Sequence, residues 1–222
     1  LGISYLGALP STVSASVVLV SIAGGNVAAA IFNASISSLL GVVLTPLWMR
    51  LAGGEVAGEL DLWASILDLS FKVVLPVLLG LFLHRSLFPR IKPYLNRLKY
   101  LDQTVILSIV FTTFSESFSQ KLFSSFSWLS LGGLALFMLC ILLLVFGILF
   151  ILVRLLSFSR EDQIAALFCG STKSLVHGVA MGKVLFPSSA ILGLVLLPVM
   201  LYHLQQLILG SILAKYFEKK KP

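Results

Sequence analysis

The chain has 222 residues, of which 58% are hydrophobic and 11% charged, and its mean hydropathy is +1.04. A soluble domain averages roughly 25% charged residues, so this composition excludes a soluble globular protein and indicates a polytopic membrane protein. The net charge of +7 does not indicate nucleic-acid binding, because the Lys and Arg residues cluster between apolar runs rather than along one helical face. Cys140 and Cys169 lie inside apolar segments, which favours two buried thiols over a disulfide or a metal site.

Apolar segments of membrane-spanning length run along the whole chain. A helix that crosses a bilayer needs about 20 predominantly apolar residues. Segments that meet or nearly meet this length are residues 1–23, 27–50, 63–85, 100–118, 127–154, 162–185 and 189–216. The chain begins at Leu1, inside an apolar segment and without a signal-peptide pattern, so we expect an N-terminal portion to precede it. These spans predict an all-α protein with seven of its membrane helices in this chain.

The charges of the connecting segments predict the orientation. The connection 86–99 and the tail 217–222 are rich in Lys and Arg, and the positive-inside rule places both in the cytoplasm. The connection 51–62 carries three acidic residues and no basic residue, which fits the outer face. We therefore expect a multi-pass protein of the cell inner or plasma membrane with a cytoplasmic C-terminus.

An internal repeat links the two ends of the chain. The segments PSTVSASV (10–17) and GSTKSLVH (170–177) share Ser-Thr-x-Ser after a helix-breaking residue. Each precedes a second match, SSLLGVVLTP (37–46) and SSAILGLVLLP (188–198), in which four residues separate a Gly from a Pro. The two copies run in opposite directions across the predicted membrane, which is typical of secondary transporters with inverted repeats and discontinuous helices. The alternative is chance, because Ser, Gly and Pro are common in membrane helices.

Both Ser-Thr-x-Ser motifs are candidate parts of a binding site. Pro10 lacks an amide proton and Gly170 is flexible, so we expect each to break its helix. Broken backbone in a membrane is tolerated only where it is buried in protein or lines a watery cavity. Hydroxyl groups beside the breaks are therefore candidates to bind a solute or ion at the helix crossing; they are Ser11, Thr12, Ser14, Ser16, Ser171, Thr172 and Ser174. The alternative is that these small residues only let helices approach closely.

Lys173 is the one charge near the middle of the predicted span 162–185. It lies roughly 15 Å from either end at the helical rise, too far for easy snorkelling. We expect it to face a polar interior or to titrate, because burial disfavours the charged form. The alternative is a structural lysine that caps carbonyls of the broken segment. His177 follows at i+4 and shares the face of Lys173 if the helix is regular; an ordinary hydrogen-bonded histidine is the alternative.

Other polar residues in the spans carry weaker predictions. Glu116 lies near the outer end of its span and faces either a vestibule or solvent. His203, Gln205 and Gln206 predict interhelical hydrogen bonds first and a site second. The chain contains no HExxH, GxSxG or phosphate-binding glycine motif, so we expect no enzyme activity, cofactor or metal site.

Residues 9–48, LPSTVSASVVLVSIAGGNVAAAIFNASISSLLGVVLTPLW, resemble the bile acid:sodium symporter family, and most of all its sodium/bile acid cotransporter 7-like branch with the bacterial homologues. The segment ALFCGSTKSLVHGVAMGKVLF (166–186) resembles the second crossing helix of the same branch. The motif LPVLLG (75–80) and the Ser-Glu of FTTFSES (111–117) also fit. The resemblance covers essentially the whole chain.

The resemblance implies a core domain, a panel domain and two broken helices that cross at the substrate site. The core would contain residues 1–50 from the first repeat and 127–216 from the second, with its second broken helix at 162–185. The panel would contain residues 63–118, and residues 217–222 form the tail. The seven spans would be the last seven of ten helices.

The residues expected around a sodium site depart from the family pattern. By motif alignment, the acid of sodium-coupled relatives falls at Phe168, and other polar ligands fall at Val17, Ala30 and Ala34, whereas Ser16 and Thr172 remain polar. Hard cations need oxygen ligands and compensating charge, so the resemblance with these departures predicts weak or absent sodium coupling. Lys173 would stand in for the cation or load and unload a proton.

The sequence therefore predicts a symporter-like secondary transporter of small organic anions in a lipid bilayer. The organic-anion prediction depends on the charge of Lys173 and on family analogy. The first alternative is a non-transporting membrane regulator or scaffold that keeps the transporter fold. An ion channel is a weaker alternative, since the sequence has no visible ring of like side chains.

Overall fold

The computed structural model describes residues 1–52, 61–94, 127–186 and 188–219, together with scattered residues between 97 and 121. In this part of the chain all regular secondary structure is helical, which confirms the all-α prediction. The elements are α1 (Gly2–Ala8), α2 (Val13–Ile22), α3 (Val27–Ala52), α5 (Leu62–Leu69), the π-helical turn η1 (Ser70–Val74), α6 (Leu75–Ile91), the short 3-10 helix η2 (Lys92–Tyr94), α8 (Trp128–Leu155), α9 (Arg160–Ser171), α10 (Leu175–Leu185) and α11 (Ser189–Lys219).

Most of the predicted spans correspond to long apolar helices. The spans 27–50, 127–154 and 189–216 correspond to α3, α8 and α11, and the span 162–185 to α9 and α10 together. By length and composition, these four segments can cross a membrane, and the bent pair of α1 and α2 makes a fifth. The described residues thus form a polytopic membrane protein.

Two other predicted spans differ from regular helices, and a third is largely undescribed. The span 1–23 is divided into α1 and α2, which are bent by 63° at the break between them. The span 63–85 is longer than predicted, because α5, η1 and α6 follow one another without interruption as far as Ile91. The predicted span 100–118 lies mostly outside the described residues.

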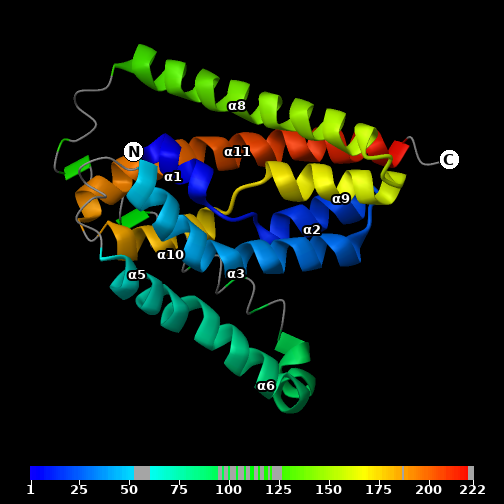
Figure 1. Cartoon of the computed structure of the whole chain (residues 1–222), viewed down its shortest axis with the longest axis horizontal. Coiled ribbons are helices and arrows are strands. Elements are labelled where there is room, and N and C mark those ends of the chain that lie inside the picture. The colour runs from blue at the N-terminus through cyan, green and yellow to red at the C-terminus, as the bar shows by residue number, and fades with distance from the viewer. Residues whose placement is uncertain are drawn as a thin grey trace.

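The helices of the bundle lie side by side along one long axis (Figure 1). Helix α8 covers one edge, where it packs on α9 and α11. The pair α1 and α2 packs between α11 and α3, and α9 contacts α2, α3 and α8. Helix α6 diverges from the opposite edge of the bundle (Figure 1). The two interrupted helices therefore lie at the centre of the bundle.

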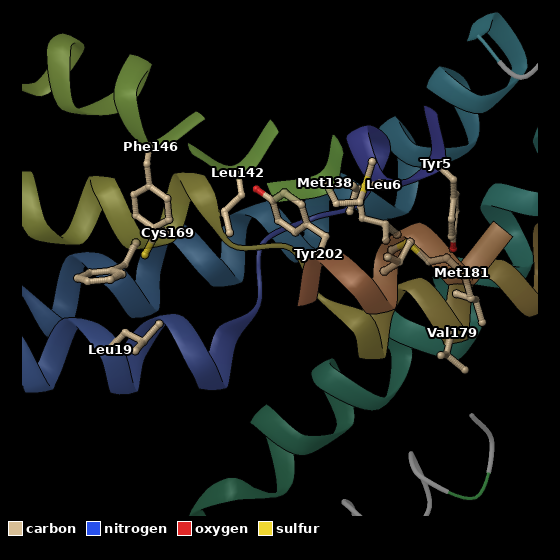
Figure 2. Packing of buried hydrophobic residues seen from close by; sticks show 14 of the residues in the cluster. Tyr5, Leu6, Leu19, Met138, Leu142, Phe146, Cys169, Val179, Met181 and Tyr202 are labelled. Atoms are coloured by element: carbon tan, nitrogen blue, oxygen red, sulfur yellow. The ribbon is translucent and has the colours of Figure 1, made fainter. Parts of the chain in front are cut away.

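A continuous apolar core runs through this bundle, as Figure 2 shows from Phe146 and Leu19 at one end to Tyr5 and Val179 at the other. The Tyr5 ring packs edge-on against Phe186, with 5.4 Å between ring centroids. The Tyr5 hydroxyl donates a 2.6 Å hydrogen bond to the carbonyl of Gly178 in α10. A buried hydroxyl needs such a partner, so this contact fixes how α1 meets α10.

Short polar residues begin several of the helices. Asp61, Ser127, Ser159 and Ser174 are the N-caps of α5, α8, α9 and α10, and each side-chain oxygen accepts a backbone N–H of the first turn. Such caps satisfy amide groups that lack an intrahelical partner. Ser174 is notable because it begins a helix inside a membrane span.

Asn26 joins the start of α3 to the start of α9. Its Oδ1 accepts the backbone N–H of Ala29 at 3.0 Å, which caps α3. Its side-chain amide donates to the Asp162 carboxylate at 2.8 Å, and its backbone N–H donates to the carbonyl of Glu161 at 2.9 Å. Two chain segments separated by more than a hundred residues are thus held together by one asparagine.

Candidate functional site

The two helix interruptions meet at the centre of the bundle. The first comprises Leu9–Thr12 and the second Thr172–Ser174. The Ser174 backbone N–H donates to the carbonyl of Pro10 at 3.0 Å. The Ser11 hydroxyl donates to the carbonyl of Cys169 at 2.7 Å and lies 3.1 Å from the Thr172 hydroxyl. Each break thereby satisfies polar groups of the other, as irregular backbone at membrane depth requires.

One of the two predicted helix-breaking residues is correct and the other is wrong. Pro10 lies inside the first interruption, but Gly170 is helical, and α9 continues to Ser171. A Cβ at Gly170 would lie 2.9 Å from Leu149 Cδ1 in α8, so this glycine allows close helix packing rather than a break. The second interruption therefore begins two residues later than predicted, at Thr172.

Lys173 reaches from the second interruption to the end of α1. Its ammonium Nζ donates to the carbonyls of Gly7 at 3.0 Å and Leu9 at 2.7 Å. These carbonyls belong to the last residues of α1 and the break that follows, and the intrahelical ladder leaves such groups without partners. The side chain is half-buried and has no acidic partner among the described residues. Lys173 therefore caps the broken helix, as one of the two sequence interpretations expected.

The backbone of Lys173 is held by α11. Gln206, which is fully buried, accepts the Lys173 backbone N–H at 2.7 Å and donates to the Lys173 carbonyl at 2.8 Å. His203 Nδ1 lies 3.2 Å from the same carbonyl and 2.8 Å from Gln206 Nε2. Gln205 donates instead to the carbonyl of Ala135 in α8 at 2.8 Å. The prediction of interhelical hydrogen bonds by these residues is confirmed.

His177 does not share a helical face with Lys173, because the chain is not helical from Thr172 to Ser174. His177 lies in the first turn of α10, where its Nδ1 is 2.8 Å from the Ser174 hydroxyl. Its backbone N–H also donates to that hydroxyl, at 3.2 Å. The i+4 expectation for this pair is therefore wrong, and His177 is an ordinary hydrogen-bonded histidine at a helix start.

The other predicted hydroxyls divide into three kinds. Ser16 and Ser171 are buried and donate to carbonyls of their own helices, Ser16 to Thr12 and Ser171 to Leu167. Thr12 is the N-cap of α2, although its side chain makes no capping bond. Ser14 is exposed and has no hydrogen bond to the described residues. Of the first motif, only Ser11 contacts the opposite break through its side chain.

A polar pocket of about 310 Å³ lies beside the crossing, and the sequence analysis did not predict its polar residues Asn33 and Ser37. It is lined by Ser11, Asn33, Ser37, Ala166, Cys169 and Gly170. Ser37 accepts the Ser11 backbone N–H at 3.0 Å, whereas Asn33 is exposed and has no hydrogen bond to the described residues. A free amide at membrane depth is costly unless it meets water or a solute. The missed signal is the i, i+4 spacing of Asn33 and Ser37, which places both on one face of α3.

The positions at which the sequence resemblance places sodium ligands are apolar in this chain. Phe168 is fully buried, and its ring packs edge-on against Phe146 and Phe217 at 6.3 and 6.4 Å between centroids. Ala30 and Ala34 are also fully buried in α3. The residues that the structure describes contain no group of three His, Cys, Asp or Glu that could hold a metal ion. Glu116, the predicted vestibule residue, lies outside the described residues.

Comparison with known proteins identifies the family. The family model described as the SBF-like CPA transporter family matches residues 1–219. The chain is 42% identical over 224 residues to an uncharacterized protein of Pseudomonas aeruginosa, covering 100% of this chain and 66% of that protein. It is 37% identical over 225 residues to the putative symporter YfeH of Escherichia coli, covering 99% of this chain and 65% of YfeH. It is 31% identical over 223 residues to sodium/bile acid cotransporter 7 of Rattus norvegicus, covering 96% and 62%.

The chain belongs to the SBF-like CPA transporter family, within the bile acid:sodium symporter group that the sequence resemblance indicated. This is a family of transporters rather than enzymes. The chain spans about two thirds of the length of the curated relatives it matches, 62% to 66% for these three.

Proposed function

We propose that the whole protein is a symporter-like secondary transporter of small organic anions with weak or no sodium coupling. The observation that carries this proposal is the ammonium of Lys173 at the crossing of two interrupted helices. Two carbonyls give it partial countercharge, but no carboxylate of the described residues pairs with it. A cation in this setting favours an anionic solute, because intramembrane charges require a partner.

The polar pocket beside the crossing supports the same proposal. Asn33 offers free donors and an acceptor, and Ser37 and Ser11 add hydroxyls to the lining of the pocket. We infer that an anion binds with its charge oriented toward Lys173 and its uncharged polar groups in this pocket. Lys173 either replaces the coupling cation or loads and unloads a proton.

The chemistry around Phe168 supports the proposal of weak sodium coupling. Na⁺ binds to oxygen ligands with compensating negative charge. A buried phenyl ring and two buried alanines offer no side-chain oxygen at the positions where relatives place such ligands. The ammonium of Lys173 adds repulsion toward a cation at the crossing.

Uptake by the whole protein in liposomes tests the proposal, with taurocholate and small monocarboxylates as anion probes. We expect uptake without a Na⁺ gradient, and a loss of at least tenfold in Lys173→Met. The matched control is Lys183→Met, because Lys183 is an exposed lysine in the last turn of α10. A pH gradient applied with and without Na⁺ separates proton loading from a fixed charge. Uptake that requires Na⁺ and ignores pH contradicts the proposal, as does a Lys173→Ala protein that transports normally.

The second candidate is a non-transporting membrane regulator or scaffold with the same fold. It is favoured by the observation that the Lys173 ammonium already has two protein acceptors. In that case the whole protein would bind no solute, and a water-soluble amine reagent would not reach Lys173. Solute binding together with amine labelling of Lys173 would exclude it.

The orientation, domain division and repeat of this protein belong to the same proposal. Crossed interruptions in α1–α2 and α9–α10 support an inverted repeat within residues 1–50 and 127–216. The divergence of α6 from the bundle supports a separate panel within residues 63–118 (Figure 1). We infer an inner or plasma membrane location with the C-terminus in the cytoplasm, which protease access to a C-terminal tag on sealed vesicles would test.

A further inference from the structure

A second cavity, of about 650 Å³, lies away from the crossing, between α8, α9 and α11. Its polar side chains all lie at one end, where α8 ends, α9 begins and α11 ends. This rim is made by Arg154, Arg160, Gln163 and Tyr216. The positive-inside rule assigns this end of the bundle to the cytoplasmic surface. The cavity therefore opens where lipid headgroups lie.

The remainder of the cavity is apolar and deep. From Arg154 the wall of α8 continues through Phe150, Gly147 and Phe146 to Leu143. Eleven residues of helix correspond to roughly 16 Å, about half the thickness of a bilayer hydrocarbon core. A Cβ added at Gly147 would meet no atom within 4 Å, so the missing side chain leaves open space. Such a cleft suits an extended hydrocarbon chain rather than a small polar solute.

The charges that line the cavity are both positive. The Arg160 guanidinium donates to the carbonyl of Phe217 at 2.8 Å, which fixes it at the end of α11. The Arg154 guanidinium lies over the Phe150 ring, 4.3 Å from its centroid, and pairs with no acidic side chain of the described residues. Asp162, an acid nearby in the sequence, is bonded to Ser159 and Asn26 and does not line the cavity.

We propose that this cavity binds one anionic phospholipid, with its phosphate at Arg154 and Arg160 and an acyl chain along α8 as far as Leu143. Basic pockets between membrane helices at the cytoplasmic side are suited to anionic headgroups. The guanidinium group binds a phosphate through two parallel hydrogen bonds. In a zwitterionic headgroup, the headgroup's own cation partly neutralises the phosphate charge, so this binding is weaker. The site is separate from the helix crossing, so it does not depend on the proposed substrate or coupling; it shares only the cytoplasmic orientation proposed above.

The thermal unfolding midpoint of the whole protein in detergent tests the proposal, because a ligand that binds only the folded state raises it. Dioleoylphosphatidylglycerol is expected to raise the midpoint, and dioleoylphosphatidylcholine is expected to raise it less or not at all. Glycerol phosphate, which has the headgroup charge without the chains, is expected to have no effect. Equal shifts from the two phospholipids, or a shift from glycerol phosphate alone, would overturn the proposal.

Two variants separate the headgroup from the chain. Arg154→Gln removes the free guanidinium, and Gly147→Leu fills the apolar part of the cavity; each is expected to weaken phosphatidylglycerol binding at least tenfold. The matched controls are Arg90→Gln, at an exposed arginine of α6, and Gly133→Leu, at another glycine of α8 where a Cβ meets nothing within 4 Å. Unchanged binding in both test variants refutes the site. Equal losses in test and control variants would show only a general effect of membrane charge or helix bulk, and would refute it as well.

Discussion

The two helix interruptions have related sequences but opposite chemical roles. In the first, Leu9–Thr12, the chain turns by 63° between α1 and α2, and it contributes mainly carbonyl acceptors. In the second, Thr172–Ser174, the chain contributes donors, namely the Lys173 ammonium and the Ser174 backbone N–H. Val13 in the first motif corresponds to Lys173 in the second, so a single position accounts for much of the difference.

This difference shows how a broken helix can be stable inside a membrane. Pro10 removes an amide proton, so the first interruption has more acceptors than donors. The second interruption supplies the missing donors, and α11 in turn holds it through Gln206. The first interruption therefore receives donors for its carbonyls from the second, and α3 holds it through Ser37, while α11 holds the second. Variants on either side can break this dependence.

The largest effect on stability is expected at Gln206, which holds the second interruption in place. Gln206→Leu removes both hydrogen bonds to the Lys173 backbone from a fully buried position, which we expect to destabilise the protein by about 2–3 kcal/mol. Gln205→Leu is the matched control, because Gln205 makes one hydrogen bond and its Oε1 is buried without a partner in the described residues. The measurement is the midpoint of unfolding in detergent as denaturant increases. A larger loss for Gln205→Leu would contradict the role given to Gln206.

A smaller effect is expected where α3 packs against the first interruption. A Cβ at Gly41 would lie 2.9 Å from Pro10 Cγ, and a proline ring cannot rotate away. We expect Gly41→Ala to destabilise the protein by about 1–2 kcal/mol through overpacking. Gly80→Ala in α6 meets no atom within 4 Å and should gain about 0.5–1 kcal/mol from helix propensity. If both variants unfold at the same midpoint, the first interruption is not packed as described.

The smallest effect on stability is expected for the Ser11 hydroxyl, which joins the two interruptions. Ser11→Ala removes the bond to the Cys169 carbonyl and the contact with Thr172, at an expected cost of about 1 kcal/mol. Ser14→Ala, in the same motif, should be neutral because Ser14 is exposed and has no partner in the described residues. Thermal unfolding of the two single variants measures the difference. Equal midpoints would mean that the two motifs do not meet through Ser11.

Membrane spans were the most predictable feature of this chain, because long apolar runs have few alternatives to a membrane helix. The break at Pro10 was also predictable, since proline lacks an amide proton whatever its surroundings. Gly170 was not, because the sequence does not show whether a glycine bends the chain or admits a neighbour. Here Leu149 of α8 occupies the space, and the helix continues.

Tertiary contacts decided the parts of the site that the sequence left open. The two interpretations of Lys173 differ only in what its ammonium reaches, and that depends on how α1 folds back beside α10. Asn33 and Ser37 share one face of α3, but their importance appears only when the fold places that face beside Ser11. Gln206 was noted as polar, but its two bonds to one distant residue have no local sequence signal.

The asparagine that joins the starts of α3 and α9 has a mechanical consequence. Asn26 joins these helices at one end, and Ser11 joins them again through its contacts with Ser37 and Cys169. Two helices that are joined at two points along their length cannot slide or rotate relative to each other unless these contacts break. We therefore expect α2, α3 and α9 to move as one rigid unit relative to the segment α5–η1–α6.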